Sequence, residues 1–122
     1  MRLSPLMTTA TLGCVMPQPV PDSASVPVWV TSHNRSSVDV YYACGQLEAM
    51  WLGEVEAKER DRFEVPGPRA RCIRGLNFFL VHRDLNRGYW VGPLALRGGS
   101  GIRLTIEKYA GLSGARVAEG LE

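Results

Sequence analysis

The side chains with the clearest potential for acid–base chemistry are three glutamates, Glu54, Glu56 and Glu59, and one histidine, His82. A pair of carboxylates on either side of a glycosidic bond carries out glycoside hydrolysis. In an extended chain, however, Glu54 and Glu56 lie on the same face of a strand, where water solvates both. We therefore expect no catalysis from these groups. The alternative is a small hydrolase or carbohydrate-active domain that uses Glu54 or His82.

Two short motifs share letters with catalytic signatures but lack the residues that make those signatures work. His82-Arg83-Asp84-Leu85 resembles the catalytic-loop tetrad of protein kinases, which requires a downstream Asn and a separate Asp-Phe-Gly. Tyr89 stands where that Asn belongs, and the 122-residue chain has no Asp-Phe-Gly. Gly98-Gly99-Ser100-Gly101 is out of register for a serine-hydrolase elbow, and a glycine-rich hairpin turn accounts for it. We expect Asp84 to be an ordinary turn residue.

No pattern of metal ligands is present. The chain has three cysteines and two histidines but no Cys-x-x-Cys, and His33 and His82 are isolated from one another and from the cysteines. Zinc sites are built from closely spaced pairs of such ligands. We therefore predict neither a bound metal nor a cofactor.

Aromatic residues form the candidate binding surface. Several of them alternate away from the valines of their segments, and Trp and Tyr combine a large apolar area with a polar group suited to glycan or protein binding. The alternative is that they fill the other face of a sandwich or cover its ends. The candidates are Trp29, Tyr41, Trp51, Tyr89 and Trp90.

The elements that would position these residues are short β-strands. Apolar and polar residues alternate with a period of two in most segments, and Gly, Pro, Asn and Ser punctuate them. The run around Phe78 and Phe79 is apolar on both faces, so we place it in the middle of a sheet. We find no segment with a convincing helical period. The seven predicted strands cover residues 26–31, 38–44, 49–55, 62–65, 76–82, 89–92 and 102–107.

Seven short strands in about 80 residues predict an all-β fold, a seven-stranded antiparallel β-sandwich of the immunoglobulin type or a related one. A strand, an Asn/Ser turn, a second strand with Asp39-Val40-Tyr41 and a closing Ile102-Arg103-Leu104-Thr105-Ile106 also resemble small bacterial secreted or lipid-anchored β-sandwich proteins of unassigned function. We expect the domain to span residues 26–108, followed by a flexible tail at 109–122.

Topology predicts a disulfide between Cys44 and Cys72. Cys44 ends the second predicted strand in phase with its inward-facing valines, and Cys72 precedes the fifth. In an immunoglobulin-type sandwich these two strands are antiparallel neighbours, which brings the two cysteines together. The alternative is a pair of buried free thiols.

The first 25 residues resemble the end of a bacterial lipoprotein signal peptide followed by a tether. A basic residue and a weakly apolar stretch lead to Gly13-Cys14, although Pro5, Thr11 and Leu12 depart from the usual pattern. The resemblance implies that Cys14 carries lipid. The proline-rich residues 15–27 favour an extended spacer. The alternatives are a secreted or periplasmic protein, and a cytosolic β-sandwich with free thiols.

The charge balance excludes several classes of partner. With 14 basic and 12 acidic residues the formal net charge is +2, which indicates no nucleic-acid partner. No apolar run reaches the roughly 20 residues of a membrane-spanning helix, so membrane contact is expected only through lipid on Cys14. We therefore predict a non-enzymatic accessory or binding module of the bacterial cell envelope, with an unidentified protein or glycan partner.

Overall fold

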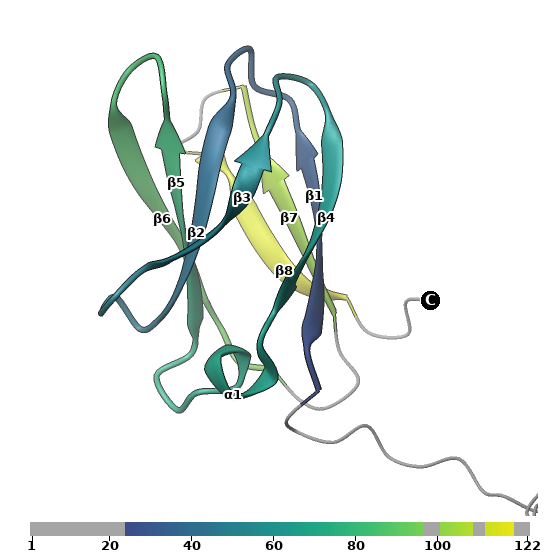
Figure 1. Cartoon of the computed structure of the whole chain (residues 1–122), viewed down its shortest axis with the longest axis vertical. Helices are drawn as coiled ribbons and strands as arrows, with labels where there is room; N and C mark the ends of the chain where they lie inside the picture. The colour runs from purple at the N-terminus through teal and green to yellow at the C-terminus, as the bar shows by residue number, and fades with distance from the viewer. Residues whose placement is uncertain (1–23, 97–100, 109–111, 119–122) are drawn as a thin grey trace, which may run out of the picture.

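Strands account for almost all of the regular structure. The computed structural model describes residues 24–96, 101–108 and 112–118 (Figure 1). Cys14 and Ser100 lie outside the described residues. No helix among the described residues is both long and apolar enough to cross a bilayer. In chain order the elements are β1 (Val26–Ser32), β2 (Val38–Cys44), β3 (Met50–Val55), β4 (Arg60–Val65), α1 (Gly67–Ala70), β5 (Leu76–His82), β6 (Arg87–Leu94), β7 (Gly101–Ile106) and β8 (Gly114–Ala118).

The strands form two four-stranded sheets, with the orders β4-β1-β7-β8 and β3-β2-β5-β6. Figure 1 shows the two layers packed against each other, with α1 at one end. The prediction of an all-β sandwich is confirmed. The prediction that all strands are antiparallel is wrong in one place, because β1 pairs in parallel with β7 and makes the first sheet mixed. Alternation within each strand gave no information about this pairing.

The described residues contain eight strands, one more than predicted. The additional strand, β8, falls in the segment that we expected to be a flexible tail. Its residues Gly114-Ala115-Arg116-Val117-Ala118 pair antiparallel with β7. Glycine and alanine favour strands weakly, so the sequence signal was poor. Backbone hydrogen bonds to β7, and not strand-favouring side chains, hold these residues in a strand.

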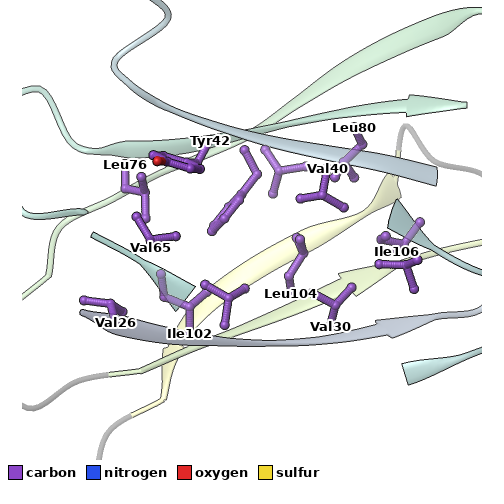
Figure 2. Close-up of a cluster of buried hydrophobic side chains, with 14 of the residues drawn as sticks. Val26, Val30, Val40, Tyr42, Val65, Leu76, Leu80, Ile102, Leu104 and Ile106 are labelled. Carbon is purple, nitrogen blue, oxygen red and sulfur yellow. The ribbon is translucent and has the colours of Figure 1, made fainter. Parts of the chain in front are cut away.

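The core lies between the inner faces of the two sheets (Figure 2). In β1 every second residue is buried, so its valines face inward and Trp29 faces outward. The same alternation in β2 and β7 sends large aliphatic side chains into the same layer. Burying one such side chain contributes about 1.5–3 kcal/mol. The largest fully buried residues include Phe78, Leu76, Leu80, Ile102, Leu104 and Ile106.

A disulfide joins Cys44 to Cys72, as the topology predicted. Strands β2 and β5 are antiparallel neighbours, and Cys44 lies opposite Leu76 at the end of that ladder. The Cα atoms of the two cysteines are 5.9 Å apart, within the range that a bridge requires. The Gly45 N–H also donates to the Gly75 carbonyl at 2.8 Å. The bridge therefore ties the loop after α1 to the end of β2.

At the opposite end of β2 the polar side chain of Asn34 joins several loops. It is 2% exposed. Its Nδ2 donates to the carbonyls of Glu107 and Lys108 at 3.1 and 3.0 Å, and its Oδ1 accepts from the Ser36 N–H at 2.9 Å. The His82 ring nitrogen Nε2 lies 3.3 Å from the same Nδ2. We call these groups the Asn34 cluster. It connects the β1–β2 turn to the end of β7 and to β5.

Candidate binding surface

Four aromatic side chains cross the outer face of the β3-β2-β5-β6 sheet, one from each strand. Tyr41 on β2 pairs with Trp51 on β3 and with Phe79 on β5, and Phe79 pairs with Trp90 on β6. We call Trp51, Tyr41, Phe79 and Trp90 the aromatic row. Neighbouring strands in a sheet are about 4.8 Å apart, so partners in register place their rings in contact.

The rings contact one another in tilted and edge-on geometries. The centroids of Tyr41 and Trp51 are 5.7 Å apart with an interplanar angle of 78°, and those of Phe79 and Trp90 are 4.8 Å apart at 43°. Tyr41 and Phe79 link the two pairs at 6.5 Å. The two central rings are half-buried by their neighbours, whereas Trp51 is 52% exposed and Trp90 38% exposed. The row therefore offers solvent two large tryptophans on a supported aromatic base.

A bulge in β3 directs Trp51 outward. Val40 pairs with Gly53 and Tyr41 with Trp51, so Leu52 has no partner of its own on β2. If β3 continued its regular alternation through Leu52, Trp51 would share the inner face of Gly53. Bulges commonly redirect a side chain in this way. The bulge is thus the local feature that completes the aromatic row at the edge of the sheet.

A glycine on β6 makes room for the central Phe79 ring. A Cβ at Gly88 would overlap the ring of Phe79, which extends diagonally across the sheet over the Gly88 backbone. Val81, two residues further along β5, is the residue paired with Gly88. Gly88 therefore allows Phe79 to lie flat enough to contact both Tyr41 and Trp90.

A charged group borders the aromatic row. Arg83 binds Asp39 through Nη2 at 3.1 Å and through Nε at 3.2 Å, and its Nη1 binds Glu54 at 3.1 Å. The hydrogen bond to Asp39, reinforced by Glu54 and Glu56, raises the pKa of Arg83 above its ordinary value. Its guanidinium, half-exposed, stays charged and is held by Asp39 and Glu54.

The structure separates the other two predicted aromatics from the row. Trp29 lies on the outer face of the other sheet, where the Arg62 guanidinium sits 5.6 Å from its ring centroid. Tyr89 is opposite the buried Leu80 and in edge contact with His82 at 6.1 Å. The row instead includes Phe79, which was not among the predicted candidates. Its register with Tyr41 could have identified it only once the sheet order was known.

Three of the four candidate acid–base residues, Glu54, Glu56 and His82, have a side-chain contact in the fold, and Glu59 makes hydrogen bonds through its backbone. Glu54 binds Arg83, and Glu56 accepts from the Ser37 hydroxyl at 3.3 Å. Asp84 lies in the β5–β6 turn, where it accepts from the Ser36 hydroxyl at 2.8 Å. His82 is buried in the Asn34 cluster. The absence of catalysis remains a prediction, and the contacts seen for these side chains join one loop or strand to another.

Among the described residues no group of three potential metal ligands comes together. No protein-family model and no curated protein matches the chain. Among solved structures it is similar to a protein from Eubacterium rectale, with a TM-score of 0.49 and 8% identity over 79% of this chain and 90% of that chain. It is also similar to a candidate cell adhesion protein from Bacteroides ovatus ATCC 8483, with a TM-score of 0.47 and 10% identity over 78% of this chain. The chain spans 44% of that second protein, and neither likeness identifies a family.

Proposed function

We propose that this protein is a non-enzymatic binding module that docks another protein on its aromatic row. The observation that carries the proposal is the exposure of Trp51 and Trp90 at the two ends of one continuous row. Binding hot spots are enriched in Trp, Tyr and Arg, and they gather at the centre of an interface with a polar rim around them. The row and the neighbouring Arg83 have this composition.

The ring geometry favours a protein over a glycan. Neighbouring rings of the row are inclined to one another by 78°, 54° and 43°, so the four rings do not form one flat platform for a polysaccharide. Inclined rings leave notches between them into which the aliphatic or aromatic side chains of a partner can pack. We therefore expect the partner to present an apolar protein surface to the row.

Charge adds one feature to the expected partner. Three carboxylates, those of Asp39, Glu54 and Glu56, surround the single guanidinium of Arg83, and all three act electrostatically on it. This end of the surface is therefore acidic by two charges. A partner with a lysine or arginine at the matching end would be complementary, and such complementarity raises association rates and selects orientation.

The test is a comparison of two variants in partner capture from envelope extract. Trp51→Ser with Trp90→Ser removes the exposed ends of the row, and Leu85→Ser removes an exposed apolar side chain, 61% exposed, from the β5–β6 turn as a control. We expect the captured protein, once identified and purified, to bind the control normally. It should bind the row variant at least about thirtyfold more weakly, equivalent to roughly 2 kcal/mol. Melting temperatures would establish that both variants fold.

Three outcomes would contradict the proposal. A captured protein that binds the row variant and the control equally would show that the row is not the interface. Binding of the purified chain to a glycan array, lost with Trp51→Ser, would assign a glycan instead. Dimerisation that the same substitution abolishes, measured by sedimentation, would assign the row to self-association.

We also propose that the domain works outside the cytoplasm, held at the bacterial envelope by lipid on Cys14. The Cys44–Cys72 disulfide supports an oxidising compartment, since such bridges are rare in the cytosol. Cys14→Ser should release the protein from the membrane fraction, and intact mass should show an acylated amino terminus in the wild type. Two titratable thiols in protein from its native source would instead favour the cytosolic alternative.

A further inference from the structure

The outer face of the other sheet contains a cavity of about 450 Å³ that is broadly open to solvent. This face, formed by β4-β1-β7-β8, is the side of the sandwich away from the aromatic row. The volume falls within the range of small-molecule pockets. Six of the lining residues lie on three adjacent strands. Trp29 and Thr31 are on β1, Arg103 and Thr105 on β7, and Gly114 and Arg116 on β8.

The sheet register arranges these residues in two rows. Trp29 pairs with Arg103 and Arg103 with Arg116, which gives a row of one indole and two guanidiniums. Thr31 pairs with Thr105 and Thr105 with Gly114, which places two hydroxyls beside that row. A Cβ at Gly114 would meet no atom within 4 Å, so this exposed position beside Thr105 is open to solvent.

Arg103 and Arg116 lie directly opposite each other, and like charges in this position destabilise a strand pair. The ion pairs found among the described residues involve Arg62 and Arg83, and neither Arg103 nor Arg116 takes part in one. Arg62, in the same face, is already bound to Glu64 at 2.7 Å. The two opposed guanidiniums are therefore available for an anion from outside the chain.

The other lining residues are one carboxylate, Glu107, and three apolar residues, Leu104, Leu112 and Ala115. Arg103, Thr105 and Glu107 follow one another at every second position along the outer face, so cation, hydroxyl and carboxylate form a line. Residues two apart in a strand are separated by roughly 6.7 Å. A ligand with an oxyanion at one end and hydroxyls along its body would satisfy Arg103 first, then Thr105, and donate a hydroxyl to Glu107.

Stacking of a sugar ring on Trp29 is not part of this arrangement. Its indole lies over Gly101, where a Cβ would crowd the ring, and the Arg62 guanidinium lies over the ring as well. The Arg62 guanidinium thus occupies a position over the ring that a stacked sugar would need, and Trp29 borders the cavity. Selectivity would come from hydrogen bonds and charge, and arginine pairs bind phosphate or carboxylate through paired N–H donors.

We infer that this cavity binds a small hydroxylated oxyanion, a sugar acid or a sugar phosphate, with Arg103 and Arg116 on the oxyanion and Thr31, Thr105 and Glu107 on the hydroxyls. The site is separate from the aromatic row and independent of the partner proposed for it.

The test is titration of the ¹⁵N-labelled protein with glucuronate, glucose 6-phosphate, glucose and inorganic phosphate, followed by amide chemical shifts. We expect saturable shifts at Thr31, Thr105 and Gly114 with glucuronate or glucose 6-phosphate, and the tighter of the two identifies the oxyanion as carboxylate or phosphate. Glucose and inorganic phosphate should each bind at least about tenfold more weakly, because each lacks one half of the required groups.

Three variants separate binding from folding. Gly114→Val places a branched side chain beside Thr105 with a residue that favours strands, so it should weaken binding while the protein stays folded. Arg116→Glu replaces two opposed cations with a cross-strand ion pair, so it should raise the melting temperature and abolish binding. Arg87→Gln, on an exposed strand of the other sheet, removes one positive charge elsewhere and should leave affinity unchanged.

Any of three results would overturn the inference. These are no saturable shift with either charged sugar, equal affinity for glucose or for inorganic phosphate, and undiminished affinity in folded Gly114→Val or Arg116→Glu.

Discussion

Replacing Asn34 by alanine should destabilise this protein more than any other single change at a polar loop residue. The side chain is buried and makes three hydrogen bonds, to the Glu107 and Lys108 carbonyls and from the Ser36 N–H, besides its contact with His82. A net hydrogen bond contributes about 1 kcal/mol, and a buried group left without a partner costs about 1–3 kcal/mol. The three bonds are part-buried, so water can reach some of the groups that lose a partner. We therefore expect a loss of about 3 kcal/mol.

The measurement is urea unfolding at neutral pH, with the midpoint shift read at constant slope. Asn34→Asp supplies the matched control, since it keeps the shape and the Oδ acceptor for the Ser36 N–H but loses both N–H donors. It would also place a carboxylate against the Glu107 and Lys108 carbonyl oxygens. We expect Asn34→Asp to be at least as destabilising as Asn34→Ala. A loss below about 1 kcal/mol for alanine, or near-native stability for aspartate, would show that the donors do not hold these loops together.

Three further predictions concern the rest of the fold. Replacing both Cys44 and Cys72 by alanine opens a link between residues 28 positions apart, and should lower the free energy of unfolding by about 3.6 kcal/mol in the chain-entropy account, measured by urea unfolding. Gly88→Ala forces a methyl group into the Phe79 ring and should cost about 1–3 kcal/mol, with a changed near-ultraviolet circular dichroism spectrum; an unchanged spectrum would mean that Phe79 does not lie over Gly88. Asp84→Asn, in an exposed turn, should change stability by less than about 1 kcal/mol. ATP binding by the wild type that this variant loses would contradict the prediction.

The sequence predicted most strands because each has one face in the core. Alternating valines located β1 and β2, and the doubly apolar run located β5 inside its sheet, between β2 and β6. The segment of β8 has no such pattern, since it is short and rich in glycine and alanine. Its strand state depends on hydrogen bonds to β7, which a local pattern does not encode.

The candidate surface was harder to predict than the fold. Alternation distinguishes inward from outward residues but does not say which sheet a strand joins, so Trp29 and Trp51 were grouped although they lie on different sheets. Phe79 belongs to a run that is apolar on both faces, so its pattern does not distinguish an outward-facing side chain from an inward-facing one. Only pairing with β2 and β6 shows that its outward side chain completes a row.

Asn34 shows the same limit for polar residues. The Ser-His-Asn-Arg-Ser-Ser segment predicted a turn in which side chains bond the nearby backbone, and the Ser36 N–H does donate to Asn34. The longer connections to Glu107 and Lys108 cross more than 70 positions of sequence. Local turn chemistry was therefore visible in advance, while the role of the same side chain in joining β1 to β7 was not.

The two proposed surfaces share one cause in the architecture. Because the inward-facing residues of both sheets supply the core, the outward-facing residues of each are free to differ, and here one sheet presents aromatic rings and the other arginines. Packed sheets lie about 10 Å apart, so substitutions on opposite outer faces should have additive effects on stability. Trp51→Ser combined with Arg116→Glu should therefore change the free energy of unfolding by the sum of the single changes. A departure of more than about 0.5 kcal/mol from that sum would mean that the sandwich couples its two faces through the core.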